Sequence, residues 1–138
     1  MAGLLDAYNL CGNKQALEIA KKFANWMIGY TSKLTHDQLQ EMMNCEIGGI
    51  SESLANLYAA CGETKYLDLS NRLYHEAILT PLSEGKDILK GKHANTQIPK
   101  LIGLARMHEL TNDTLDEKTA EYFWDRVVHH HSYVTGGH

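Results

Sequence analysis

The chain has 138 residues, of which 43% are hydrophobic and 22% are charged, as in one ordinary globular domain. Its net charge is −4 and no basic patch stands out, so nucleic acid is excluded as the expected partner. No apolar run approaches the roughly 18 residues of a membrane-spanning helix, so no membrane partner is expected. The start MAGLLDAYNLCGNK lacks the basic stretch and the cleavage-like end of a signal peptide.

Three segments of the sequence align without a gap at an offset of 50 residues. They are LLDAYNLCGNKQALEIAKKFANWMI at 4–28, LANLYAACGETKYLDLSNRLYHEAI at 54–78 and LARMHELTNDTLDEKTAEYFWDRVV at 104–128. Each segment predicts a helix, a tight turn at Gly12, Gly62 or Asn112, and a second helix, because glycine and asparagine tolerate the left-handed conformation that ends many helices. The repeat therefore predicts an all-α chain built from helical hairpins.

The two helices of each hairpin differ in polarity. The first helix carries few charges and is expected inside the assembly, whereas the second carries many and is expected outside. The expected inner helices span 2–11, 47–61 and 95–111, and the expected outer helices span 14–30, 64–79 and 115–130. Only SYVTGG near the C-terminus has the residues of an extended segment. A linear solenoid and a closed toroid both satisfy this pattern.

Polar residues collect in the connectors that lead into the second and third inner helices. The first connector ends in EMMNCEIGGISES and the second in GKDILKGKHANTQIPK, which places Glu46 and His93 before an inner helix at one common end of the assembly. Helix N-termini carry unsatisfied N–H groups and a positive dipole end, which suit a hydroxyl-rich or anionic ligand. Pro99 is expected in the first turn of its helix, and Gly48 is expected to let a ligand or another backbone come close.

Plain structural roles are open to the same residues. His93 can cap a helix or bond a loop carbonyl, and Glu46 can be a first-turn carboxylate that the helix dipole favours. Asn95 and Gln97 fit cap and surface positions. The sequence holds no nucleophile–base pair, phosphate-binding glycine loop or metal-ligand spacing of a familiar kind.

Cysteines and clustered histidines give no metal or disulfide signal. Cys11, Cys45 and Cys61 are odd in number and far apart, so reduced thiols are expected. The run HHH at 129–131 is not expected to share a metal ion, because adjacent residues on a helix point in different directions.

Four stretches carry a more specific signal. They are MAGLLDAY at 1–8, EIGGISESLANLYAACGETKYLDL at 46–69, KGKHANTQIPKLIGLARMHELT at 90–111 and YFWDRVVHHHSYVTGGH at 122–138. In these stretches the chain resembles the β-L-arabinofuranosidase family, glycoside hydrolase family 127 and its relatives, and HANTQIP is the most specific string. The resemblance implies an (α/α)6 toroid, of which residues 1–138 would form about half, as a partial catalytic domain.

The resemblance also implies a function and a cofactor. Members of the family remove L-arabinofuranose units from plant glycans, with a cysteine nucleophile held by zinc in a Cys/Glu cluster and a separate glutamate as acid/base. Those residues lie in motifs after YVTGG, so no catalytic residue and no zinc ligand is carried onto this chain. The isolated chain is therefore expected to lack the zinc centre and to be inactive. A secreted or periplasmic location follows from the resemblance alone.

What the resemblance does carry over is part of a sugar pocket. His93 matches a histidine that faces the sugar in the family, and Glu46 stands in a motif usually written EFGG, here with Ile47 in place of phenylalanine. Asn95 and Gln97 are expected to help orient His93. The expected partner is a carbohydrate, and self-association through exposed inner helices is also expected. The alternative function is a free-standing helical repeat module that binds a peptide or partner protein along its inner groove.

Overall fold

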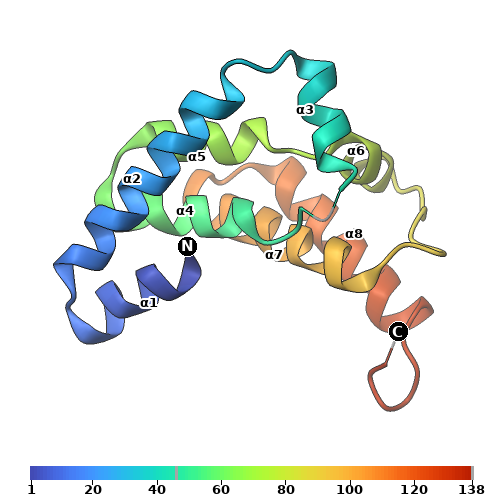
Figure 1. The fold of residues 1–138 in the computed structure, drawn as a ribbon. Coiled ribbons are helices and arrows are strands. Elements are labelled where there is room, and N and C mark those ends of the chain that lie inside the picture. Colours follow the sequence, from blue (N-terminus) through green and yellow to red (C-terminus); the bar gives the residue numbers. More distant parts are fainter. Residues whose placement is uncertain (46, 138) are drawn as a thin grey trace.

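The computed structural model describes residues 1–45 and 47–137. In this part of the chain all regular structure is helical, with eight α-helices and no β-strand (Figure 1). The helices are α1 (Ala2–Cys11), α2 (Lys14–Thr31), α3 (His36–Met43), α4 (Ile50–Cys61), α5 (Thr64–Arg72), α6 (Glu76–Ser83), α7 (Ala94–Thr111) and α8 (Thr114–His130). The predicted all-α class is confirmed. None of the described helices is both long enough and apolar enough to cross a membrane.

Three helical hairpins form where the aligned segments predict them, namely α1–α2, α4–α5 and α7–α8. The residue after the first helix of each pair is left-handed, with φ of 66° at Gly12, 73° at Gly62 and 60° at Asn112. Each of these residues donates its N–H back into the preceding helix, which satisfies a carbonyl that the helix end leaves open. These turns keep the spacing of 50 residues. For the helices and connectors between these turns, the 50-residue repeat stays a prediction.

Two features of the outer layer differ from the expected helices. Helix α3 was not expected, although Thr35 and Gln38 form a capping box in which each side chain bonds the other's backbone. The helix expected at 64–79 is broken, because α5 ends at Arg72 and α6 begins at Glu76. The connecting residue His75 is buried and serves as the N-cap of α6.

Helices α4 and α7 pack closely side by side (Figure 1). Gly103 of α7 permits this contact, because a β-carbon there would stand 3.3 Å from the β-carbon of Ser51. One helical turn further on, the Nε–H of Arg106 donates a 2.8 Å hydrogen bond to Oδ1 of Asn56. The N-terminal ends of the two helices, which carry the polar connectors, therefore lie next to each other.

The apolar core has two parts. In the first part, helices α1 through α5 pack around the fully buried Tyr66 and Leu54. In the second part, α6, α7 and α8 pack around the fully buried Phe123. The α4–α7 contact connects the two parts, so the polar ends of these helices lie where the two parts of the core meet.

One face of α2 carries large apolar side chains that remain exposed. Ile19, Phe23, Trp26 and Tyr30 follow one another at helical spacing, and we call them the α2 stripe. The ring of Trp26 stacks between those of Phe23 and Tyr30, with centroid distances of 5.8 and 5.7 Å. No described element covers this face, so the stripe is available for contact with another surface.

The segment expected to be extended near the C-terminus forms a turn instead. The N–H of Tyr133 donates to the carbonyl of Gly137 at 2.7 Å, and Gly136, at a φ of 81°, donates back to Tyr133 at 2.8 Å. The positive φ that glycine allows here closes the turn. No described strand stands beside this segment to pair with it.

Candidate functional site

His93 is the N-cap residue of α7, with extended backbone angles that turn the chain into the helix. Its side chain is exposed, and Nδ1 lies 3.2 Å from the hydroxyl oxygen of the buried Thr96. The imidazole thus stands over the first turn of α7, beside backbone N–H groups that helices leave open at this end.

Asn95 and Gln97 lie on different sides of the first turns of α7. Residues two positions apart on a helix do not face each other, whereas those four apart do. Gln97 is buried, while Asn95 is exposed. The side chain of Gln97 is directed to Lys100, with Oε1 2.7 Å from the ammonium, and the contact of Gln97 or Asn95 with a sugar stays a prediction.

Glu46, the remaining predicted sugar contact, lies outside the described residues. The connector that follows Glu46 in the sequence lies against α7, because Gly48 contacts this helix directly. A β-carbon on Gly48 would stand 3.0 Å from the carbonyl oxygen of Thr96 and 3.3 Å from the ring of Pro99. Gly48 was expected to let either a ligand or another backbone come close. The structure shows the close approach of another backbone, that of α7. Pro99 itself is the sixth residue of α7 rather than part of its first turn, because the helix begins at Ala94.

A polar network lies next to the first turns of α7, with Lys100, His75 and Gln97 buried and Asn44 exposed. The ammonium of Lys100 is 2.8 Å from Nδ1 of His75 and 2.7 Å from Oε1 of Gln97, and Nε2 of His75 is 3.1 Å from Oδ1 of Asn44. Lys100 is 6% exposed and His75 is 4% exposed. Burial lowers the pKa of Lys100 to about 8 and the pKa of His75 to about 4, and nearby lysine charges lower both further.

The sequence did not predict this network. Its partners come from three separate segments, and a lysine is rarely buried. One signal was present: Lys100 opens the apolar run that forms the inner helix, where a charged side chain has no exposed face to occupy.

Two hollows flank the network and differ in size. A pocket of about 190 Å³ lies between α7, α8 and the loop before His93, with Gln97, Phe123 and His131 in its wall. This volume is below the roughly 300–1,000 Å³ of pockets for drug-sized ligands and suits one small ring. A cavity of about 30 Å³ lies against His75 and Lys100. It has room for about one or two water molecules and not for a sugar.

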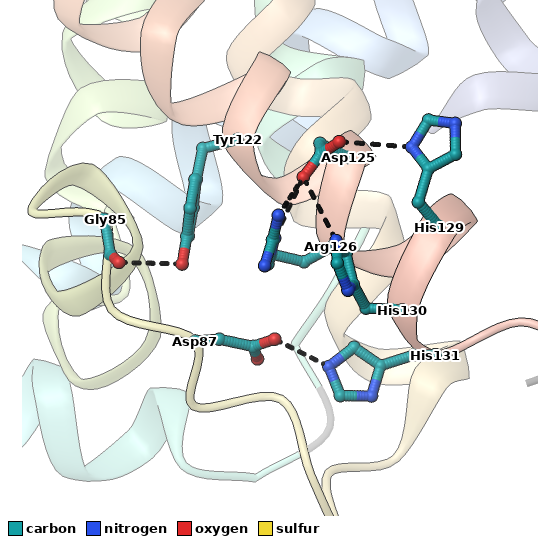
Figure 2. Close-up of polar contacts among 8 residues, drawn as sticks. All are labelled: Gly85, Asp87, Tyr122, Asp125, Arg126, His129, His130 and His131. Atoms are coloured by element: carbon teal, nitrogen blue, oxygen red, sulfur yellow. Dashed lines mark hydrogen bonds and ion pairs between the residues drawn. The ribbon is translucent and has the colours of Figure 1, made fainter.

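The histidine run at the end of α8 divides between two carboxylates (Figure 2). His129 lies 3.1 Å and His130 lies 3.7 Å from Asp125, whereas His131 lies 2.8 Å from Asp87 in a different segment. Figure 2 shows His129 and His130 each directed at Asp125 and His131 directed at Asp87, so the three rings do not face one common point. Asp125 is also paired with Arg126, and the guanidinium of Arg126 first and the imidazole of His129 next hold the pKa of Asp125 below its usual value.

The described residues do not fit the zinc centre that the resemblance implies for the family. Within residues 1–45 and 47–137, no group of three or more His, Cys, Asp or Glu side chains is placed to hold a metal ion. Cys11 and Cys45 are exposed and Cys61 is half-buried, each as a free thiol. No chemical step is therefore assigned to zinc here, and the prediction that the isolated chain lacks zinc stays a prediction.

Comparison with known protein families gives a match over residues 1–138, the whole chain, to the β-L-arabinofuranosidase catalytic domain of glycoside hydrolase family 127. No curated protein matches the sequence. The matched region includes both connectors and the N-terminal ends of α4 and α7, so the surface around His93 lies inside it.

Proposed function

The chain belongs to the family of glycoside hydrolase 127 β-L-arabinofuranosidase catalytic domains, and we propose that it forms part of the sugar-binding wall of such an enzyme. The substrate class is L-arabinofuranosides of plant glycans or related glycans. The residues assigned to the sugar are His93, Glu46, Asn95 and Gln97. The whole-chain family match is the observation that carries this proposal.

The geometry around His93 supports a sugar as ligand. A furanoside is neutral and rich in hydroxyl groups, so it needs several directed hydrogen bonds rather than an opposite charge. The exposed imidazole of His93 and the N-terminal end of α7 offer such groups side by side. The pocket of about 190 Å³ next to Gln97 has the size for one small ring.

The chain is proposed to bind the sugar and not to cleave it alone. Cleavage of a glycosidic bond needs a general acid and either a nucleophile or an activated water on opposite sides of the bond. No described cluster offers a metal-held thiolate for this role. The proposal therefore assigns this chain to binding, and it assigns bond cleavage to other parts of the family's catalytic domain.

Binding and hydrolysis can be measured separately on the 138-residue chain. Methyl β-L-arabinofuranoside is titrated into ¹⁵N-labelled protein, and hydrolysis of an aryl β-L-arabinofuranoside is followed in parallel. The expected result is a saturable set of shifts around residues 93–97 and no release of the aryl group. The pyranose form of the same sugar serves as the control. Absence of saturable shifts, or equal shifts with the pyranoside, would contradict the proposed function.

The chain is also proposed to associate with itself. The exposed apolar side chains that support this include the α2 stripe on an outer helix, and Leu10 and Ile102 on the inner helices α1 and α7. Contiguous exposed apolar surface of this kind commonly marks a contact surface.

A further inference from the structure

The network behind the candidate sugar surface fixes the direction of each hydrogen bond. An ammonium group has three donors and no acceptor. Nδ1 of His75 and Oε1 of Gln97, at 2.8 and 2.7 Å from Lys100, must therefore both accept. An imidazole that accepts at Nδ1 carries its proton at Nε2, which can then donate to Oδ1 of Asn44 at 3.1 Å. With Lys100 charged and His75 neutral, the side chains of Lys100, His75, Gln97 and Asn44 all have hydrogen-bond partners of the correct kind.

The protonation states agree with the burial of the two bases. Burial first, and the charges of Lys100 and Lys92 next, lower the pKa of His75 to about 4, so it is neutral near pH 7. Burial and the charge of Lys92 lower the pKa of Lys100 to about 8, which leaves most of it protonated near pH 7. The donor on Lys100 is therefore present under ordinary conditions.

The network joins the two connectors that carry the proposed sugar contacts. Asn44 follows α3 and stands two residues before Glu46, while Gln97 stands four residues after His93. His75, between α5 and α6, bridges them through Lys100. Lys100 therefore links, through His75, the segment that holds Asn44 to the first turns of α7.

We propose that Lys100 is a positioning residue that holds the amide oxygen of Gln97 inward, so that the amide NH₂ is the end presented to the sugar. This inference rests on the proposed function and deepens it. A primary amide can offer either an acceptor or two donors to a ligand, and the two orientations are similar in shape. Lys100 selects one of them, because only the oxygen can accept from an ammonium. Gln97 therefore recognises a sugar hydroxyl group by donating a hydrogen bond to its oxygen.

The first experiment observes the side-chain NH₂ of Gln97 by NMR without any sugar. Its signal is assigned by its loss in Gln97→Glu. In Lys100→Met, which keeps the length of the side chain and removes the donor, the signal should shift and broaden, because the amide is released. Lys118→Met is the matched control, since it removes the same charge from an exposed position on α8 and should leave the signal unchanged. An unchanged Gln97 signal in Lys100→Met overturns the proposal.

The second experiment adds methyl β-L-arabinofuranoside to the same proteins. The wild-type Gln97 NH₂ signal should shift, and the affinity of Lys100→Met should fall about threefold to tenfold, as for one lost hydrogen bond. Equal affinity in a folded Lys100→Met overturns the positioning role. A wild-type protein that shows no response to the sugar overturns the proposed function, while the sugar-free spectra still decide whether Lys100 holds Gln97.

Gln97→Glu provides a test that does not depend on the folding of Lys100→Met. The carboxylate can still accept from Lys100, so the network keeps its connection and the melting temperature should equal or exceed that of the wild type. The NH₂ donor is lost, however, so affinity for the sugar should fall by a similar factor. A Gln97→Glu protein that binds the sugar as tightly as the wild type overturns the proposal.

Discussion

The carbonyl oxygen of Thr96 lies 3.0 Å from the point where a β-carbon on Gly48 would stand. The ring of Pro99 closes the same space at 3.3 Å. The connector before α4 thus packs directly on the backbone of the first turns of α7, and Gly48 is the residue that permits this contact.

Gly48→Ala should lower the free energy of unfolding by about 1–3 kcal/mol, the usual range for overpacking a tight contact. The reason is that the nearest atom is a backbone oxygen of a helix, which cannot move aside as a flexible side chain can. Chemical denaturation of the two proteins measures the difference. Gly49→Ala is the matched control, because a β-carbon there would meet Pro99 only at 3.7 Å, an ordinary contact. Equal stabilities of the two variants would contradict this account of Gly48.

The buried Lys100 should make the protein more stable as the pH rises above neutrality. Its pKa is about 8 in the folded chain and 10.5 in the unfolded chain. Between these values the unfolded chain binds more protons, so the free energy of unfolding increases with pH. The gain from Lys100 between pH 8 and pH 10 should be about 2 kcal/mol.

Comparison with Lys100→Met isolates this effect. The variant has no ammonium to deprotonate, so its stability should lack the rise between pH 8 and pH 10. Burial raises the pKa of Tyr66 and of Tyr74, which opposes stability above pH 10 in both proteins and sets the upper limit of the measurement. Parallel pH profiles of wild type and Lys100→Met would show that Lys100 titrates normally.

His93→Ala should lower kcat/KM at least roughly tenfold in a catalytically active protein that contains this chain, a loss of about 1.4 kcal/mol. We expect a hydrogen bond from His93 to a sugar hydroxyl that strengthens in the transition state. The melting temperature is measured on the same samples. His108→Ala, which removes a 2.9 Å contact with the Asp113 carbonyl at the other end of α7, is the control for a purely local histidine. A fall in melting temperature alone would assign His93 a structural role.

The α2 stripe should drive self-association. Trp26→Lys, at a position 61% exposed in the middle of the stacked rings, should shift light scattering towards the monomer. Trp124→Lys is the control, because Trp124 is 59% exposed but lies on α8 outside the stripe. A wild-type protein that is monomeric at all concentrations would contradict the prediction.

Metal analysis of the purified chain should find less than one zinc per chain. A zinc site usually needs three or four placed Cys, His or carboxylate ligands, and the described residues offer no such group. Any purification tag is removed first, because added histidines bind zinc. One tightly bound zinc per chain would contradict this prediction.

The sequence predicted the hairpin turns well because their information is local. Gly12, Gly62 and Asn112 each occupy a left-handed position that few other residue types adopt, so the residue type alone marks the helix end. Helix α3 also has a local signal, the Thr35 and Gln38 capping box, but it lies outside the three aligned segments.

The break between α5 and α6 could not be predicted in the same way. No glycine or proline lies between Arg72 and Glu76 to mark it. The break coincides with the buried contact of His75 with Lys100, which stands 25 residues further along the chain. The orientation of Gln97 is likewise set by Lys100, and such contacts between segments leave no periodic trace in the sequence.

Pro99 has a consequence for the motions of α7. Proline has no N–H, so it cannot donate to the carbonyl of Asn95 four residues earlier, and the helical ladder is interrupted there. The first turn is held instead by its contact with the Gly48 connector. Its amides should therefore exchange hydrogen with solvent together with those of the connector and faster than the amides after Pro99. A bound ligand would slow this exchange in both segments at once.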